Sequence, residues 1–514
     1  VVFAVVVFAA YNRFDGGVFM ENIICEKLNF SYPTSTHSVL NDVDFTVSGG
    51  EFCLVIGRSG AGKSTLLKLM KKEIAPHGTL TGSIKINGNV GYVAQNVDEN
   101  IVTDKVRSEL SFGLTNMGLS RETIELSVAE TASYFNLSDK LDNDISTLSG
   151  GEKQLLNLAS VMITKPEILV LDEPTCQLDP VSAQRFVAVV KRLNRDFGTT
   201  VVISEHLTEE LLPYADSVMI IENGEVILKD TPQNAVSFLK QSHNPLLGEI
   251  PLFMRLFDDA NSVSQCREVL KNKDLPLLHT ESEDVKTALR LKNISFAYIK
   301  NHDVLKSLDL RVYKGKINVL LGANSSGKTT ALKVAAGVLK AHHGKVKTDG
   351  KVSMLCQNPF DLFTKERCED EVKFGKITEF LQIEDIKKQH PYDISGGQAQ
   401  RLALAKVLEK NADIVLLDEP TKALDYELKV RLADILYRLC DEGKTVVIAT
   451  HDIDFAGEYG DYISFLSNGE IVTTMPRREF FTSLNFYTTC TAKITNGIAT
   501  GYVGEKDLND GGIL

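Results

Sequence analysis

The sequence contains no hydrophobic run long enough to cross a membrane. Its longest fully apolar stretch is VVFAVVVFAA, residues 1–10 of 514, whereas a spanning helix needs about 20 such residues. No basic residue precedes the run and no clear cleavage site follows it, so it makes a poor signal peptide. Met20 opens MENIICEKLNFSYP like a natural start. We therefore interpret residues 1–19 as a tag or N-terminal extension, with a membrane-touching segment as the alternative, and a membrane role would require partner subunits.

Paired cysteines are missing as well. The eight cysteines are scattered along the chain, and none forms a C-x-x-C pair. This pattern favours reduced thiols in a cytosolic protein over a disulfide framework or a zinc site.

The sequence also lacks an excess of basic residues. The 56 Lys and Arg are outnumbered by 68 Asp and Glu, which gives a net charge of −12. A nucleic-acid-binding protein usually presents a basic face, so this balance argues against such a partner, although a local basic patch can be hidden in the total.

What the chain does contain is a large internal repeat. Six segments recur in the same order, and the spacing from the signature serine to the Asp of the acidic pair is 23 residues in each half (172−149 and 418−395). The pairs are LNFSY and ISFAY, GRSGAGKST and GANSSGKTT, LSGGEKQ and ISGGQAQ, ILVLDEPT and IVLLDEPT, VVISEH and VVIATH, and IIENGEVI and FLSNGEIV. The repeat predicts two domains of one fold. We expect them at 20–240 and 289–480, with a connector at 241–288 and a C-terminal tail at 481–514.

Short apolar runs place these motifs in an α/β fold. ILVLD and IVLLD end in an acid, as expected for central parallel strands whose carboxyl ends carry a site. FCLVIG and INVLLG each lead through a Gly-rich turn into a helix. We predict a mainly parallel sheet and a helical insert in each domain.

Each half carries the phosphate-loop pattern G-x-x-x-x-G-K-[ST]. The glycines let backbone N–H groups turn toward phosphate oxygens, and the following helix aims its positive end at them. We expect Lys63 and Lys328 to reach the β- and γ-phosphates, and Ser64 and Thr329 to offer hydroxyls to Mg²⁺.

The second loop has Ser325 where the first has Gly60. If that position requires a positive φ, serine costs about 1 kcal/mol relative to glycine. We expect the loop to tolerate the serine.

Polar residues end three strands in each half. The Asp that ends one strand can bind Mg²⁺, and the Glu next to it can polarise the attacking water. A His ends the next strand, 34 (206−172) or 33 (451−418) residues after the Asp. A Gln ending another strand can touch Mg²⁺ or the water. A Tyr precedes the lysine by 31 (63−32) or 30 (328−298) residues and can stack on adenine or simply close a strand. These residues are Asp172, Glu173, His206, Gln95 and Tyr32, and Asp418, Glu419, His451, Gln357 and Tyr298.

Ser149 and Ser395 begin amphipathic helices with the turn Ser-Gly-Gly. Each serine is suited to cap its helix, and the helix start is a second anion site. This site comes too late in each half to coincide with the phosphate loop. If the halves pack head to tail, each phosphate loop faces the other half's signature, so that ATP joins the halves and hydrolysis releases them.

Together with an acidic D-loop (Asp179 and Asp425), this ordered set of motifs resembles the ABC-type ATPases from Met20 to about residue 480. The resemblance implies ATP and Mg²⁺ as cofactors and two composite sites. One would combine Lys63, Gln95, Asp172, Glu173 and His206 with Ser395 and Gly397, and the other Lys328, Gln357, Asp418, Glu419 and His451 with Ser149 and Gly151. The remaining ATP-binding positions would be Tyr32, Gly57, Gly60, Gly62, Ser64, Thr65, Gly150, Tyr298, Gly322, Ser325, Gly327, Thr329, Thr330 and Gly396.

Residues 91–119, TPQNAVSFLK and IPLFMRLF are similar to the ATPases of energy-coupling factor importers, which take up vitamins and metal ions. This implies a peripheral protein at the cytoplasmic face of the cell membrane, with an integral-membrane coupling subunit and a substrate-capture subunit as partners and no nucleic acid. The first insert, Gln95 to Ser149, spans 54 residues and the second, Gln357 to Ser395, spans 38, so we expect the two halves to grip the coupling subunit unequally.

Two alternatives remain open. Non-transport tandem ATPases that act on ribosomes or nucleic acid usually join their domains by a long charged helical linker. Residues 241–290 instead contain six Lys and Arg, eight Asp and Glu and three prolines, which favours the importer. A sugar-import tandem ATPase would differ mainly in its partners.

Overall fold

The computed structural model of the chain describes residues 21–513, apart from gaps at 34–36, 98–99, 207, 258–259, 261, 272, 274, 279–284, 301, 423 and 486. The interpretation of residues 1–19 therefore lies outside the described residues. The chain divides into two compact units. The first unit comprises residues 1–175 and Gln184–Ala235, and the second comprises Cys176–Ala183 and Val236–Leu514.

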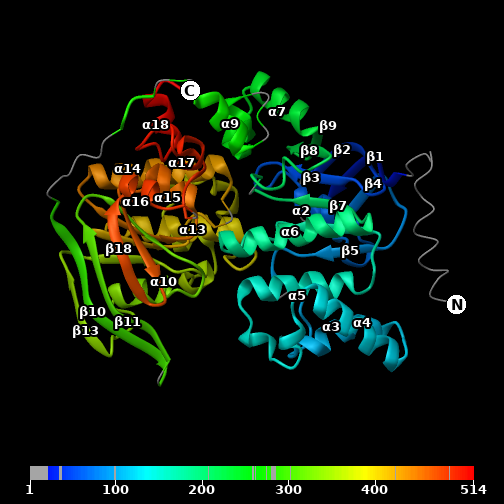
Figure 1. Cartoon of the computed structure of the whole chain (residues 1–514), viewed down its shortest axis with the longest axis horizontal. Coiled ribbons are helices and arrows are strands. Elements are labelled where there is room, and N and C mark those ends of the chain that lie inside the picture. The colour runs from blue at the N-terminus through cyan, green and yellow to red at the C-terminus, as the bar shows by residue number, and fades with distance from the viewer. Residues whose placement is uncertain are drawn as a thin grey trace. The chain divides into compact units, whose positions relative to one another are not determined.

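The first unit is built on a six-stranded sheet in the order β5-β6-β7-β3-β8-β9 (Figure 1). Neighbouring strands run parallel except β9, which pairs antiparallel with β8 at the edge. The central strands are fully buried apolar runs, as a sheet covered on both faces requires. Their bounds are β3 Phe52–Ile56, β5 Val90–Val93, β6 Ile168–Asp172, β7 Thr200–Ser204, β8 Ser217–Glu222 and β9 Glu225–Asp230.

Helices of the first unit follow the strands or form its insert. α2 (Lys63–Leu69), α5 (Gly150–Met162) and most of α6 (Pro180–Phe197) alternate with its strands, and α7 (Pro232–Gln241) begins in this unit and ends in the second. The insert contains α3 (Val106–Asn116) and α4 (Arg121–Tyr134). The capping serine Ser120 accepts a hydrogen bond from the backbone N–H of Thr123 at the start of α4.

The second unit repeats this plan, which confirms the predicted tandem α/β fold. Its main sheet has the order β14-β15-β16-β12-β17-β18, with only β18 antiparallel. The strands are β12 Ile317–Leu321, β14 Val352–Leu355, β15 Ile414–Asp418, β16 Thr445–Thr450, β17 Tyr462–Ser467 and β18 Glu470–Pro476. The helices are α10 Lys328–Ala335, α11 Cys368–Glu371, α12 Lys376–Phe380, α13 Gly396–Glu409, α14 Tyr426–Asp441, α15 Ile453–Tyr459 and α16 Arg477–Ser483.

Each unit also has a three-stranded antiparallel sheet that the sequence analysis did not predict. In the first unit the order is β2-β1-β4, with β1 Glu21–Ser31, β2 Leu40–Ser48 and β4 Thr79–Ile86. In the second it is β11-β10-β13, with β10 Thr287–Ile299, β11 His302–Tyr313 and β13 His343–Thr348. One face of each sheet packs into a core cluster that includes the helix after the phosphate loop.

The connector packs on the C-terminal tail inside the second unit. The connector contains α8 (Leu252–Leu256) and α9 (Val263–Leu270), and the tail contains α17 (Cys490–Thr495) and α18 (Glu505–Asp510). Arg255 Nη1 donates to Glu505 Oε2 at 2.8 Å, and Tyr502 Oη donates to the Pro276 carbonyl at 3.0 Å. Within the described residues, no helix is both long and apolar enough to span a membrane.

Candidate active site

The first phosphate loop joins β3 to α2. Gly60 and Gly62 have φ of 81° and 101°, so the left-handed turn falls on glycines. A side chain at Gly57 would place its Cβ 2.3 Å from the Ile221 carbonyl oxygen, so the loop passes close against β8. Lys63, the first residue of α2, folds back and donates from Nζ to the carbonyls of Gly57 (2.6 Å) and Arg58 (3.2 Å). The lysine ammonium therefore lies within its own loop.

The second loop has the same geometry. Lys328 donates from Nζ to the carbonyls of Gly322 (2.8 Å) and Ala323 (3.1 Å). Gly327 has a φ of 108°, and Ser325 has a φ of 62° where Gly60 has 81°. The second loop therefore does place a serine in the left-handed conformation, where serine costs about 1 kcal/mol relative to glycine.

Glu173 is the centre of the first site. It follows β6 with a φ of 43°, a strained conformation that persists only where its surroundings impose it. Its carboxylate lies 3.0 Å from His206 Nε2 and 3.7 Å from Lys63 Nζ, and it accepts from Gln95 Nε2 at 3.0 Å. Burial alone would raise the pKa of Glu173, but the hydrogen bond and charge of His206 and the charge of Lys63 outweigh burial and lower the pKa to about 2. The carboxylate is ionised at neutral pH.

Glu419 holds the same place after β15, with a φ of 51°. Its carboxylate lies 3.0 Å from His451 Nδ1 and 3.6 Å from Lys328 Nζ, and accepts from Thr450 Oγ1 at 3.2 Å. Burial opposes ionisation, but His451 and Lys328 together lower the pKa of Glu419. Gln357, the counterpart of Gln95, is exposed and donates no side-chain hydrogen bond within the described part of the chain.

Asp172 ends β6 and is surrounded by hydroxyl groups. Ser64 Oγ and Ser204 Oγ donate to Oδ1 at 2.9 and 3.0 Å, and Tyr92 Oη donates to Oδ2 at 3.1 Å. Burial and then the charge of Glu173 raise the pKa of Asp172, while the three hydroxyls favour its ionised form.

Asp418 lacks two of these donors. In the strand registers, Ala449 lies where Ser204 lies beside Asp172, and Met354 takes the place of Tyr92. Both carboxylate oxygens of Asp418 are buried and neither has a hydrogen-bond partner in bonding geometry. Burial raises the pKa of Asp418 to about 6, although the nearby Thr329 hydroxyl acts in the opposite direction.

These residues fit a magnesium ion whose coordination shell is completed by phosphate oxygens of the substrate. Mg²⁺ is usually held by one or two protein oxygens together with phosphates and water. The unpartnered oxygens of Asp418 beside Thr329 match that requirement, as does the pair of Ser64 and Asp172. Among the described residues, no three His, Cys, Asp or Glu side chains cluster into an all-protein metal site.

The signature turns cap their helices as predicted. Ser149 accepts from the N–H of Glu152, whose carboxylate accepts from the Ser149 N–H at 2.8 Å. Ser395 and Gln398 form the same reciprocal pair at the start of α13. The helix N-termini are thus fixed, with Gly150 and Gly396 exposed.

The tyrosines lie beside the phosphate-loop threonines. Tyr32 Oη and Thr65 Oγ1 are 3.1 Å apart, and Tyr298 Oη and Thr330 Oγ1 are 3.3 Å apart. Tyr298 is 58% exposed, so its ring is accessible to a ligand. This geometry is compatible with both adenine stacking and strand closure.

The sequence analysis missed four residues at these sites: Tyr92, Ser204, Glu205 and Thr450. Glu205 is fully buried, accepts from the Thr175 N–H at 2.7 Å, and has its pKa raised to about 7 by burial. Comparison of the two halves could have found the first two, because SMLCQN has Met354 where GYVAQN has Tyr92, and VVIATH has Ala449 where VVISEH has Ser204.

The sequence matches the family of ABC transporters over residues 40–176 and 305–422. A provisionally named ABC transporter ATP-binding protein of Bacillus anthracis is 36% identical over 90% of this chain and 93% of that protein. One from Streptomyces coelicolor is 31% identical over 91% of this chain and 96% of its own. Among solved structures, an archaeal ribosome recycling factor in complex with a ribosomal stalk protein has a TM-score of 0.62 at 21% identity, covering 89% of this chain and 91% of that one. At that identity the likeness concerns the fold.

Proposed function

Because the chain belongs to the ABC transporter family and is an ATPase with two nucleotide-binding domains in tandem, we propose that it is the motor subunit of an energy-coupling factor importer. In this role it hydrolyses ATP at the cytoplasmic face of the cell membrane. Hydrolysis drives the uptake of a vitamin, metal ion or similar small solute through separate coupling and substrate-capture subunits.

The proposed catalytic groups are Glu173 and Glu419. Each carboxylate is ionised and held by a histidine and the phosphate-loop lysine, so it can accept a hydrogen bond from the attacking water. The water oxygen bonds to the γ-phosphorus while the bond from that phosphorus to the bridging oxygen breaks, and the water's proton passes to the carboxylate and from there to the released phosphate, which yields ADP and phosphate. Lys63 and Lys328 exchange their loop carbonyls for phosphate oxygens when ATP binds.

Mg²⁺ supplies charge neutralisation for the phosphate oxygens when it is bound. The residues proposed to hold it are Ser64, Asp172 and Gln95 in one site and Thr329, Asp418 and Gln357 in the other. ABC ATPases pair their two halves, and we propose that Ser149 and Ser395 complete the opposite half's site. Closure on ATP would then be transmitted through the segments after Gln95 and Gln357.

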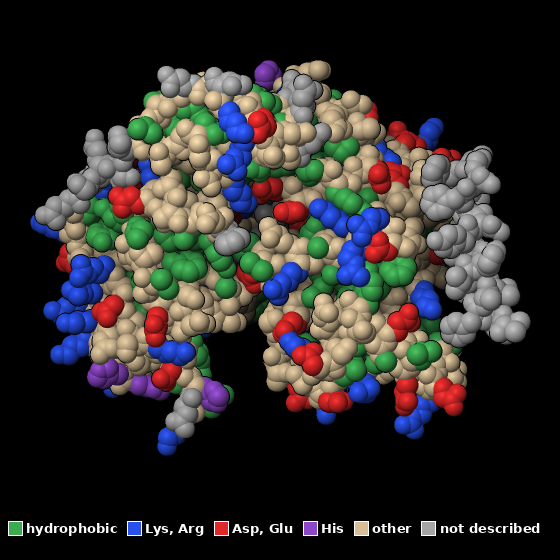
Figure 2. Space-filling model, viewed as in Figure 1, with side chains coloured by type: hydrophobic (Ala, Val, Ile, Leu, Met, Phe, Trp, Pro, Cys, Tyr) green, Lys and Arg blue, Asp and Glu red, His purple; other side chains and the backbone are tan. Residues whose placement is uncertain are grey.

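The observation that carries the importer proposal is the surface of the first insert. Five large apolar side chains between residues 102 and 126 are exposed: Val102, Phe112, Met117, Leu119 and Leu126, with exposed fractions of 42% to 65%. Residues 100–148 also contain eight acids and four bases, and Figure 2 shows acidic side chains at the lower right, where Figure 1 places α3 and α4. A contiguous exposed apolar patch marks an interaction site, and we infer that these five side chains form one. Cytoplasmic loops of membrane proteins are rich in Lys and Arg. An apolar and acidic surface is complementary to such loops.

The second insert offers much less apolar surface. Between Gln357 and Ser395, only Tyr392 is a large exposed hydrophobic residue among those described, and its ring stacks on Phe360 at 5.4 Å. This difference supports the expectation that the two inserts contact the coupling subunit unequally.

The alternative is a tandem ABC ATPase that acts on ribosomes or nucleic acid without transport. The recycling factor that shares the fold binds a ribosomal stalk protein, and at 21% identity it neither favours nor opposes that role for this chain. A sugar importer remains the second alternative. The family match does not distinguish among these three roles.

The deciding experiment is to purify the chain from its host in mild detergent and to identify what accompanies it. We expect an integral-membrane protein that holds the chain on membranes through a high-salt wash. Met117→Asp with Leu126→Asp should abolish this retention and leave ATPase activity unchanged. The matched control, Val269→Asp with Val338→Asp, changes two similarly exposed residues of the second unit and should retain the partner. Sedimentation with ribosomes instead would overturn the importer proposal in favour of the alternative.

A further inference from the structure

The antiparallel sheet of the second unit has a basic outer face. Arg290 on β10 lies directly opposite Arg311 on β11 and opposite Lys347 on β13, and Lys292 lies opposite Lys345. Directly opposite residues share one face of a sheet, and the alternating residues Leu289 and Leu291 are buried on the other face. Figure 2 shows Lys and Arg side chains gathered at the lower left, where Figure 1 places β10, β11 and β13.

One acid, Asp309, shares this face two residues from Arg311, but none of the five cations forms an ion pair in the described part of the chain. Arg290 Nε is buried without an acceptor. Like charges placed directly opposite on a sheet are destabilising, so the bare protein carries three repulsive cross-strand pairs that an anion would relieve.

The corresponding sheet of the first unit shows that the fold does not require this charge. Strands β10, β11 and β13 carry six Lys or Arg and two Asp, a net of +4. Strands β1, β2 and β4 carry two Lys and four Asp or Glu, a net of −2. The same fold therefore exists with the opposite sign, and the basic face is specific to the second unit.

This face is separate from the nucleotide site. Tyr298, beside the phosphate loop, lies eight residues along β10 from Arg290, which is about 26 Å at 3.3 Å per residue. At physiological salt, charges more than about 8 Å away are largely screened, so the net charge of −12 does not cancel the attraction of the local patch.

We propose that this face, centred on Arg290, Lys292, Arg311, Lys345 and Lys347, is a docking surface for the anionic headgroups of a lipid bilayer. The face is cationic, and its central residues include no aromatic side chain that could stack on bases, which binding of single-stranded nucleic acid commonly uses. The cytoplasmic loops of a membrane protein are basic and would be repelled. Anionic headgroups attract such residues, with about a fivefold gain in affinity for each cation near the surface.

The test uses the purified full chain and protein-free vesicles. Vesicles of phosphatidylglycerol mixed with phosphatidylcholine are compared with pure phosphatidylcholine by co-sedimentation at low salt. We expect binding only to the anionic vesicles, lost near 1 M salt, where the screening length falls to about 3 Å. Lys345→Gln with Lys347→Gln should weaken binding about 25-fold. The control, Lys72→Gln with Lys85→Gln, makes the same charge change on exposed residues of the first unit and should bind normally.

Each other outcome overturns the proposal. Absence of binding at low salt excludes the lipid surface, and equal loss in both double variants shows that overall charge is responsible. Displacement of the chain from vesicles by a lower concentration of RNA phosphate than of lipid phosphate would assign the face to nucleic acid. Because no membrane protein is present, failure here leaves the importer proposal intact, and that proposal is decided by the co-purified partner.

Discussion

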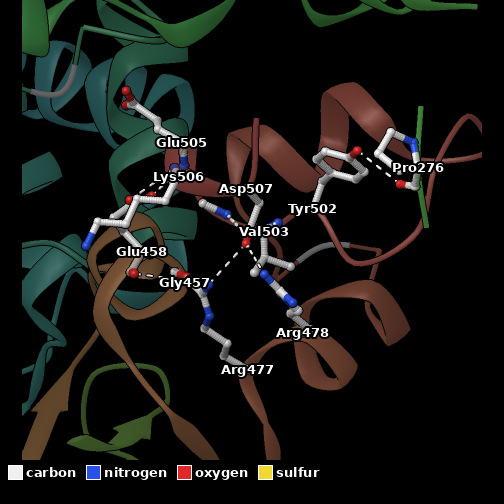
Figure 3. Close-up of polar contacts among 11 residues, drawn as sticks. Pro276, Gly457, Glu458, Arg477, Arg478, Tyr502, Val503, Glu505, Lys506 and Asp507 are labelled. Carbon is white, nitrogen blue, oxygen red and sulfur yellow. Dashed lines mark hydrogen bonds and ion pairs between the residues drawn. The ribbon is translucent and has the colours of Figure 1, made fainter. Parts of the chain in front are cut away.

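Arg478 donates a hydrogen bond from Nη2 to Oδ1 of Asp507 at 2.6 Å, which ties α16 to α18 across 29 residues of sequence. Asp507 is fully buried. Arg477 Nη2 donates to the same oxygen at 3.1 Å, and the N–H groups of Val503 and Gly504 donate to Oδ2 (Figure 3). One carboxylate thus joins the end of the chain to the second ATPase domain.

Asp507→Ala should therefore release the C-terminal segment. Breaking a buried charge pair by removing one partner costs about 3–5 kcal/mol, because the other charge is left without compensation. We expect faster amide hydrogen exchange at Val503, Gly504 and α18. Asp510→Ala changes an exposed acid on the same helix and should have no such effect. Equal protection in both variants would show that apolar packing alone holds the tail.

The same contact predicts an acid-sensitive step. Burial opposes ionisation of Asp507, but the charge of Arg477 and the hydrogen bond from Arg478 lower its pKa below the ordinary value of 3.8. A depressed folded-state pKa contributes stability above the unfolded-state pKa, and that stability is lost as the pH falls through the folded-state pKa. Protection of α18 should therefore be constant from pH 7 to about pH 5 and decline below about pH 4. If protection began to decline near pH 6, the decline would have to come from the titration of a group other than Asp507.

Sequence reasoning predicted what is encoded locally. The serine caps, the strand-loop-helix units and the acids that end β6 and β15 each depend on a few adjacent residues. The antiparallel sheets were not predicted, because β1 and β10 change register at irregularities and these irregularities break the alternation of apolar residues. Tyr92 and Ser204 reach Asp172 from 80 and 32 residues away, so only the strand order of the folded sheet brings them together.

Asp418→Asn and Asp172→Asn should change stability in different directions. The buried carboxylate of Asp418 has a pKa of about 6 against an ordinary 3.8, and a shift of that size corresponds to ~3 kcal/mol of strain at neutral pH. Asparagine removes that charge, so the nucleotide-free second unit should become more stable by up to that amount. Asp172→Asn instead replaces one of the two oxygens that accept from the three hydroxyls with an NH₂ group and removes the charge that strengthens those hydrogen bonds, so it should be neutral or destabilising.

The measurement is amide hydrogen exchange of β6 and β15, without ATP and with magnesium chelated. Since wild-type Asp418 becomes protonated as the pH falls from about 6 toward 4, the gain from Asp418→Asn should shrink over that interval. A gain that does not change with pH would mean that the substitution improves packing and does not remove a charge.

Glu173→Gln combined with Glu419→Gln should abolish turnover while ATP still binds. Glutamine keeps the size of glutamate but cannot accept the proton of the attacking water, and loss of a general base typically costs about 100-fold or more. Phosphate release measures turnover, and retained labelled ATP measures binding. Glu442→Gln changes an exposed glutamate of the second unit and serves as the control. Wild-type turnover in the double variant would refute the roles proposed for both glutamates.

Ser325→Gly and Gly60→Ser form a reciprocal pair that tests the strain in the two phosphate loops. Ser325 has a φ of 62° and Gly60 a φ of 81°, and no atom lies within 4 Å of a Cβ built at Gly60. The exchange therefore alters backbone strain without a steric clash. Ser325→Gly should stabilise the second unit by about 1 kcal/mol, and Gly60→Ser should destabilise the first by about as much. Denaturant unfolding followed by hydrogen exchange in α2 and α10 measures both changes.

Because the left-handed conformation is present before ATP arrives, ATP affinity should change less than about twofold. A tenfold increase in affinity for Ser325→Gly would show that the serine loop reaches this conformation only when nucleotide binds.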